Sequence, residues 1–339
     1  MKLIVQIPCL NEEQTIGETI ADIPREIAGV DEVQILIIDD GSTDDTVKAA
    51  REAGAHHIVS FAQNRGLAAA WSAGIEAALR LGADVIVNTD ADNQYGGECI
   101  PDLVRPIVAR EADMVVGARP IDEIEEFSWA KRRLQRLGSW VVRKVSATDI
   151  SDATSGFRAY SRAAAMGLTV VSDFTYTHET LIQAGRSGLA VAEVPIRTNP
   201  TTRESRLFRS IPEYIRRSVG TILRIYALYQ PGVFFNIVGA VFAGLGVALG
   251  IRYLYFMAIG EGTGHVQSVI VGAMLVMVGA LSVVVGVLAD LIGANRKLVQ
   301  DTLQRVKELQ LMSENERRSR EAVPPSRTSE APERGEDAR

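Results

Sequence analysis

Two long apolar runs toward the C-terminal end limit what this chain can fold into. Residues 233 to about 259 and residues 266 to 292 are almost continuously apolar, and only the polar, glycine-rich sequence GEGTGH separates them. Each run exceeds the roughly 20 residues that a helix needs to cross about 30 Å of hydrocarbon. A buried helical hairpin in a soluble protein is the alternative. The length of the runs favours a transmembrane hairpin with both ends on one side of the membrane.

Basic residues on either side of this hairpin indicate its orientation. The loop between the runs has no Lys or Arg, whereas basic side chains flank them: Arg203, Arg206, Arg209, Arg216, Arg217 and Arg224 before, Arg296, Lys297, Arg305 and Lys307 after. Because basic flanks stay on the cytoplasmic side, the pattern predicts a multi-pass protein of the cell (inner or plasma) membrane with both termini cytoplasmic. Arg252 and Asp290 lie near the span ends, where we expect them to snorkel to headgroups.

The sequence predicts five segments. Residues 1–205 read as a soluble domain, and the apolar stretch at their start is too short for a signal peptide, so we expect this domain in the cytosol. Residues 206–230 combine apolar residues at helical spacing with arginines, which suits a helix in an anionic membrane interface; a soluble amphipathic helix is the alternative. The hairpin occupies 231–293, a charged cytoplasmic helix 294–312, and a Pro/Ser/Glu/Arg-rich disordered tail 313–339.

Charge and cysteine content exclude some classes of function. The 36 Lys and Arg residues are outnumbered by 42 Asp and Glu residues, for a net charge of -6, so no basic excess exists to neutralise nucleic-acid phosphates. The two cysteines, Cys9 and Cys99, cannot form a disulfide framework, and no Cys/His cluster indicates zinc. We expect both cysteines to be small buried residues.

The soluble domain alternates apolar strands with helices. Strands are predicted at residues 3–7, 33–38, around 58, 85–88 and 114–117, and helices at residues 15–27, 43–53, 67–81 and 101–110. Continuous apolar strands separated by helices predict an α/β fold with a mostly parallel sheet and helices on both faces. Ser42 and Asp45 form a capping-box pattern at the start of the second helix.

Three of the predicted strand ends are acidic. The first strand is followed by PCLNEE, the second by DDGSTDD and the fourth by TDADNQY, and ligands of parallel sheets bind beyond such ends. No glycine-rich dinucleotide or P-loop motif is present. A divalent metal that bridges carboxylates and a diphosphate would explain the charge. Asp90 and Asp92 are the candidate ligands of Mg²⁺ or Mn²⁺, and solvated turn carboxylates are the alternative.

These strings occur in an order that resembles a known family. P-C-L-N-E-E, I-D-D-G-S-T-D-D-T, N-R-G-L-A-A-A, D-A-D-N-Q, S-G-F-R-A-Y and a late V-P-I…R-E-S-R-L follow one another as in family-2 glycosyltransferases. The chain is similar in particular to the polyprenyl-phosphate sugar synthases, the dolichyl-phosphate mannose synthase-like group, over about residues 1–207. The resemblance implies a GT-A fold, a nucleotide-sugar donor and inversion at the anomeric carbon.

The resemblance also assigns roles to residues. Donor-binding positions match Pro8, Asn11, Glu12, Asp39, Asp40, Asp90, Gln94, Arg203 and Arg206, and the metal pair matches Asp90 and Asp92. Ligands of the acceptor phosphate match Arg119, Lys131, Arg132, Arg133 and Arg136, for which a solvated basic helix face is the alternative. Asp92, Glu179 and Arg132 are the implied catalytic residues. Asp152, Ser155 and Arg158 fall beside the site, and His178 is either a metal or phosphate contact or a structural histidine.

The expected reaction follows from these roles. A UDP- or GDP-linked sugar would pass, with Mg²⁺ or Mn²⁺ as cofactor, to a polyprenyl (undecaprenyl- or dolichyl-type) phosphate at the cytoplasmic membrane face; the sequence also allows a homo-oligomer. One alternative is a family-2 enzyme acting on a hydroxyl of a glycolipid or polysaccharide. The processive members of that kind carry a Q-x-x-R-W segment, whereas Gln183 and Arg186 are followed here by Ser187. The other alternative is a membrane scaffold without activity.

Overall fold

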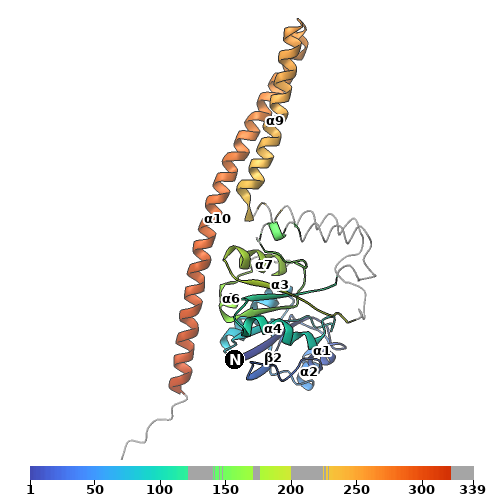
Figure 1. The fold of residues 1–339 in the computed structure, drawn as a ribbon, viewed down its shortest axis with the longest axis vertical. Helices are drawn as coiled ribbons and strands as arrows, with labels where there is room; N and C mark the ends of the chain where they lie inside the picture. Colours follow the sequence, from blue (N-terminus) through green and yellow to red (C-terminus); the bar gives the residue numbers. More distant parts are fainter. Residues whose placement is uncertain are drawn as a thin grey trace, which may run out of the picture.

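The computed structural model describes residues 1–120, 148–170, 176–199 and 229–321, with scattered positions at 140, 142–144, 146, 224 and 227. These residues form an α/β domain from which a long helical hairpin projects (Figure 1). The predicted basic run at 131–136 and most of the predicted interfacial helix lie outside the described residues.

A seven-stranded sheet forms the centre of the domain, in the order β3-β2-β1-β4-β6-β5-β7. Its strands are β1 Lys2–Cys9, β2 Glu32–Asp39, β3 His57–Ser60, β4 Val85–Asn88, β5 Met114–Ala118, β6 Arg158–Ser161 and β7 Val191–Pro195. The first four strands are mutually parallel. Strand β6 runs antiparallel to both β4 and β5, and β7 is parallel to β5. The prediction of a mostly parallel sheet is confirmed.

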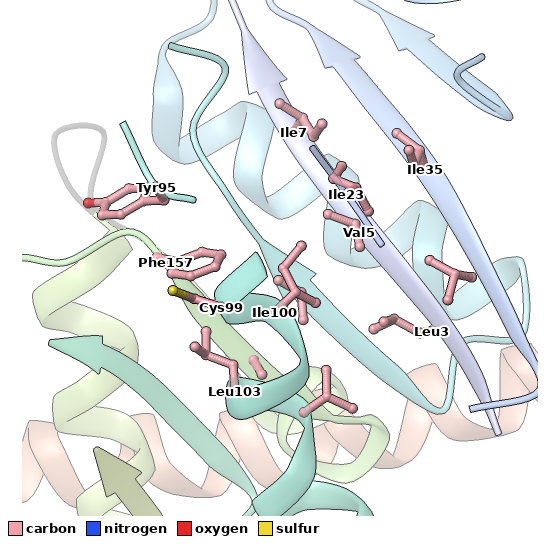
Figure 2. Close-up of a cluster of buried hydrophobic side chains, with 14 of the residues drawn as sticks. Leu3, Val5, Ile7, Ile23, Ile35, Tyr95, Cys99, Ile100, Leu103 and Phe157 are labelled. Carbon is pink, nitrogen blue, oxygen red and sulfur yellow. The ribbon is translucent and has the colours of Figure 1, made fainter. Parts of the chain in front are cut away.

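Helices cover both faces of this sheet, as predicted. One face carries α1 Ile16–Ala21, α2 Thr46–Glu52 and α4 Ile100–Val108; the other carries α3 Leu67–Arg80, α6 Arg162–Gly167 and α7 Tyr176–Arg186. Strand β1 contributes to both cores because successive side chains point to opposite faces. Its Leu3, Val5 and Ile7 pack toward α4 and Phe157, as Figure 2 shows, whereas Ile4 packs toward α3.

Some local predictions differ from the structure. Strands β6 and β7 were not expected, because β6 begins with the charged Arg158 and Glu193 interrupts the apolar run of β7. Helix α1 ends at Ala21 rather than near residue 27, since Pro24 cannot continue a helix. The capping box is wrong: Asp45 is the N-cap of α2 without a side-chain cap bond, and Ser42 Oγ instead accepts the Asn11 N–H at 2.9 Å. Both cysteines are buried and free, as expected.

The hairpin consists of α9 Pro231–Ala258, the short 3₁₀ turn η2 Gly262–His265 and α10 Val266–Glu321. Two stretches, Pro231–Ala258 and Gly262–Asn295, are long and apolar enough to cross a membrane, with mean hydropathies of 2.1 and 2.6. Only 11% and 17% of their most apolar windows are buried. A core helix of a soluble protein would be mostly buried, so the exposure favours a membrane-associated protein.

Glycines set the distance between α9 and α10. A Cβ on Gly239 would lie 2.8 Å from the Gly279 carbonyl oxygen, and one on Gly246 would lie 2.5 Å from that of Gly272. These pairs recur at a spacing of seven residues in both helices, so one face of each helix repeatedly offers only backbone. Such small residues let two membrane helices approach closely.

Helix α10 continues far beyond the apolar run. It extends to Glu321 without a break, past residue 313, where the disordered tail is predicted to begin. After Gly293 the sequence has neither glycine nor proline until Pro324, and it is rich in helix formers, which accounts for the length. On the C-terminal side of the membrane-sized segment, α10 contacts α6, and Gln304 lies beside Gly167.

Candidate active site

Three strand ends lie side by side at one edge of the sheet. Because β2, β1 and β4 are neighbours and parallel, their carboxyl ends meet at the same edge. The register places Cys9 opposite Asp39 and Gln6 opposite Asn88. The three acidic segments predicted from the sequence therefore converge, although they are far apart along the chain.

The loop after β1 is fastened to the loop after β2. Asn11 has a positive φ of 55°, which asparagine tolerates. Its Oδ1 accepts the Thr43 N–H at 2.8 Å. The Glu12 N–H donates to Thr46 Oγ1 at 2.8 Å, and Glu12 itself is buried. Pro8 lies in β1, directly before this loop. Asn11 and Glu12 thus belong to one ordered loop that Pro8 precedes, and the donor-binding role of all three stays a prediction.

Asp39 and Asp40 are both buried but have different surroundings. Asp39 Oδ1 accepts the Ser42 N–H at 2.8 Å. Asp40 accepts two backbone bonds, from the Arg65 N–H at 2.7 Å and the Gly66 N–H at 2.9 Å. Both Asp40 oxygens therefore hold the turn that begins α3. This carboxylate shapes the loop, and its negative charge also suits a helix N-terminus.

Asp90 and Asp92 follow β4 directly. The carbonyl of Ala91 between them accepts the hydroxyls of Thr15 at 2.8 Å and Thr19 at 3.1 Å, so α1 holds the turn. Asp92 Oδ1 accepts the Gln94 N–H at 3.2 Å. Burial and the charge of Asp92 raise the pKa of Asp90 to about 7, while Arg119 opposes the shift. The two carboxylates are thus close enough to repel each other.

This pair fits a divalent cation by its chemistry. Carboxylate oxygens are the preferred protein ligands of Mg²⁺ and suit Mn²⁺ as well, and a cation would relieve the repulsion between them. Within the described ranges, no group of three or more His, Cys, Asp or Glu side chains gathers. The remaining coordination positions would then belong to water or to the ligand, as in sites that bind metal with a phosphate substrate.

The segment after β7 lies against this metal motif. The Asn199 N–H donates to the Gln94 carbonyl at 2.9 Å, and Asn199 Nδ2 donates to the Asn93 carbonyl at 2.9 Å. Tyr95 and Thr198 form an isolated bridge. Gln94 therefore lies between Asp92 and the segment after β7, and its role in donor binding stays a prediction. Arg203 and Arg206 follow Asn199 closely along the chain but lie outside the described residues.

Arg119 is held by an ion pair. Its Nε donates to Asp152 Oδ2 at 2.7 Å and its Nη2 to Asp152 Oδ1 at 3.1 Å; Nη2 also reaches Thr154 Oγ1 at 2.8 Å. The Arg119 guanidinium lowers the pKa of Asp152 against the effect of burial, so the pair is ionised. Arg119 comes directly after β5, and its positive charge opposes the rise in the pKa of Asp90 that burial causes. Arg119 thus lies near Asp90 and already donates to Asp152 and Thr154, and its role toward an acceptor phosphate stays a prediction. The other basic candidates, Lys131, Arg132, Arg133 and Arg136, lie outside the described residues.

Arg158 is a structural residue. Its side chain is fully buried, and it donates to the carbonyls of Ser155 at 2.7 Å, Thr177 at 2.6 Å and Ala153 at 2.9 Å. A buried charge needs such partners. The guanidinium therefore fastens the turn before β6 to the start of α7, which carries Glu179.

Glu179 is a buried carboxylate, 5% exposed, in the first turn of α7. Its Oε1 accepts the Tyr229 hydroxyl at 3.2 Å and Gln183 Nε2 at 3.4 Å. Burial, with a smaller effect from Arg158, lowers the pKa of neighbouring His178 to about 4. A neutral imidazole supplies no positive charge to a phosphate, which argues against the phosphate contact, whereas the metal contact and the structural role both stay predictions.

Two features near the candidate site were not predicted from the sequence. Asn88, at the end of β4, donates to the Gly156 carbonyl at 2.9 Å and to the Tyr176 hydroxyl at 3.0 Å, which joins β4 to α7 beneath Asp90. A polar residue in the apolar string VIVN was the available signal. The contact of Tyr229 with Glu179 had none, because it joins residues 50 apart through tertiary structure.

Comparison with solved structures shows the fold type of the domain. Among solved structures, the chain is similar to glucosyl-3-phosphoglycerate synthase from Mycobacterium tuberculosis, crystallised with Mn²⁺, uridine diphosphate and phosphoglyceric acid. The TM-score is 0.53, with 24% identity, and the match covers 67% of this chain and 78% of that one. The fold is of the GT-A type, as expected.

Sequence comparison then gives the family. The pattern described as Glycosyl transferase family 2 matches residues 4–168. The UDP-N-acetylglucosamine–dolichyl-phosphate N-acetylglucosaminyltransferase of Methanococcus voltae is 30% identical over 217 residues, which are 57% of this chain and 83% of that protein. The dolichyl-phosphate hexose transferase of Haloferax volcanii is 32% identical over 211 residues, 60% of this chain and 86% of that one. The chain belongs to glycosyltransferase family 2 and is a glycosyltransferase, so the inactive scaffold is excluded.

Proposed function

We propose that this glycosyltransferase moves a sugar, with inversion, from a UDP- or GDP-linked donor to a polyprenyl phosphate at the cytoplasmic face of the membrane. The observation that carries the proposal is the meeting of two features at one site. The end of β4, beside the acidic segments of the family domain, is joined to α7 by the Asn88–Tyr176 hydrogen bond, and Tyr229, which leads into the membrane-sized hairpin, contacts Glu179 on α7. The acceptor activities named for the relatives from Methanococcus and Haloferax point the same way.

The donor would bind over the β1 and β2 loops. Pro8 lies just before the first loop, and Asn11 and Glu12 lie within it. Of the acidic pair, Asp39 is the better candidate to contact the base or ribose, because both oxygens of Asp40 already accept backbone N–H groups. The position of Asn199 beside Gln94 supports a role for Arg203 and Arg206 at the diphosphate, since four to seven residues of chain can span that site.

Asp90 and Asp92 would hold Mg²⁺ or Mn²⁺ against the diphosphate. The cation would neutralise the charge that develops on the leaving nucleoside diphosphate. Gln94 lies beside the pair through its backbone bond to Asp92.

The acceptor needs positive charge more than it needs a base. A lipid monophosphate is already an anion near neutral pH, so Glu179 would have little proton to remove. Arginines would instead orient the phosphate in line with the anomeric carbon by bidentate hydrogen bonds. Arg119 at the site and the basic run of Lys131, Arg132, Arg133 and Arg136 supply that charge. A hydroxyl acceptor, the second candidate, would require Glu179 as a true general base.

Separate saturation curves for donor and lipid test the acceptor assignment. We expect alanine at Arg132 or Arg133 to raise the KM for polyprenyl phosphate about tenfold or more, with a much smaller change for the nucleotide sugar. Glu179→Gln should keep measurable transfer. Exposed Arg80, which pairs with Glu76 on α3, provides the control substitution Arg80→Ala. Unaffected arginine variants together with an inactive Glu179→Gln that binds both substrates normally would favour the hydroxyl acceptor.

A further inference from the structure

The chain that enters the first apolar helix ends against the candidate active site. Tyr229 comes two residues before α9, which begins at Pro231. Its hydroxyl donates to Glu179 Oε1 at 3.2 Å, and its ring packs at the margin of the core cluster that contains the buried residues of α7. The segment leading into the membrane-sized hairpin thus contacts a buried carboxylate directly.

A second contact fixes the start of α9. Asp290 Oδ1, on α10, accepts the Gly232 N–H at 3.0 Å. The carboxylate lies so close that a Cβ on Gly232 would overlap it. A negative charge at a helix N-terminus is favourable, and the bond satisfies one of the N–H groups that the first turn leaves without a partner in the helix. Arg186, at the end of α7, interacts electrostatically with both Tyr229 and Asp290.

These contacts form one continuous series from α10 to α7. Asp290 fixes Gly232, Gly232 is three residues from Tyr229, and Tyr229 donates to Glu179. Glu179 is 5% exposed, so its orientation depends on protein donors rather than on bulk water. Another donor to Oε1 among the described residues, Gln183 Nε2, is at the longer distance of 3.4 Å and also donates to the Thr169 carbonyl.

We propose that Tyr229 is a positioning residue that orients the Glu179 carboxylate, and that the Asp290–Gly232 contact keeps Tyr229 in place. The hairpin then does more than anchor the enzyme: its packing determines the geometry of an active-site carboxylate. This inference rests on the proposed function, because it requires Glu179 to take part in transfer.

A double-mutant cycle on the full-length enzyme in nanodiscs tests the proposal. We expect Tyr229→Phe to lower kcat roughly tenfold, the scale of one hydrogen bond to a charged group, with less than about a twofold change in the donor KM. In the Glu179→Gln background the same substitution should change kcat less than about twofold, because the carboxylate that it orients is absent.

Variants in the hairpin test whether the Asp290–Gly232 contact keeps Tyr229 in place. Asp290→Ala should lower kcat several-fold, whereas Asp290→Asn keeps an oxygen that can accept the Gly232 N–H and should restore most of the rate. Tyr255→Phe, at an exposed position of α9, is the control and should match the unsubstituted enzyme.

The outcomes separate this proposal from the function on which it rests. A Glu179→Gln enzyme with full activity would show that Glu179 takes no part in transfer and would overturn the positioning role, while transfer to a lipid phosphate would stand. No labelled polyprenyl phosphosugar from the unsubstituted enzyme would overturn both. A slowed Glu179→Gln enzyme beside a fully active Tyr229→Phe enzyme would overturn the positioning role alone. Equal losses from Tyr229→Phe in both backgrounds would also overturn it, because Tyr229 would then act through the fold rather than through Glu179.

Discussion

Asp90 and Asp92 are the residues on which the proposed chemistry depends most. Asn at either position should lower the transfer rate about 10²-fold or more, because each variant removes a charged ligand from a cation that stabilises the leaving group. The measurement is the initial rate across a Mg²⁺ and Mn²⁺ titration, with Asp102→Asn on the exposed side of α4 as the control. If both variants kept full activity in EDTA, the metal assignment would fail.

The sequence predicts the place of a side chain best where that place follows from a strand end. Asn11, Glu12, Asp39, Asp90 and their neighbours meet because parallel strands end at one edge. The two hydrogen bonds that Asp40 accepts could not be predicted from the sequence, since the donors are backbone N–H groups of the turn before α3. The ion pair of Arg119 with Asp152 was hidden for the same reason: it joins two loops that only the folded sheet brings together.

Between elements, the closest packing occurs where α9 meets α10. Gly246→Ala would place a methyl group 2.5 Å from the Gly272 carbonyl oxygen and 2.8 Å from Val276 Cγ2, so the helices must separate. We expect its thermal midpoint in detergent to fall by a few degrees, since overpacking costs about 1–3 kcal/mol.

Gly244 provides the matched control for that substitution. It lies on the same helix with no atom within 4 Å of its Cβ position, so Gly244→Ala should leave the midpoint unchanged or raise it slightly through helix propensity. A Gly246→Ala protein as stable as the Gly244→Ala protein would show that the two helices are not packed as described.

The helices and strands that could be predicted from the sequence are those with a clear hydrophobic pattern. Strands β1, β2, β4 and β5 were predicted because they are mostly buried apolar runs, and the hairpin because its runs are long; the edge strand β3 is only partly buried. Strand β6 was not predicted because it starts with Arg158, whose charge is satisfied by carbonyls that only the folded turn supplies. The end of α1 was misjudged because Pro24 stops the helix before residue 27, and α10 continues to Glu321 because neither glycine nor proline occurs between Gly293 and Pro324.

For the whole molecule, the proposed topology is the feature open to the most direct physical test. Only the turn at about residues 260–265 should face outward, while both termini stay cytoplasmic, because Lys and Arg flank the hairpin and are absent from the turn. A cysteine at Thr263, in a background without Cys9 and Cys99, should react with an impermeant reagent added to intact cells. A cysteine in the tail should react only after permeabilisation, and the reverse pattern would reject the topology.

The central claim is transfer to a lipid phosphate, and product analysis with purified enzyme tests it most directly. Radiolabelled UDP- and GDP-sugars would be offered, with Mg²⁺ or Mn²⁺, to polyprenyl phosphate and to the matching polyprenol in nanodiscs. We predict one labelled polyprenyl phosphosugar, with the anomeric configuration opposite to that of the donor, and no product from the alcohol. Labelling of a glycolipid hydroxyl in native membranes, with polyprenyl phosphate left unmodified by every donor, would contradict the account.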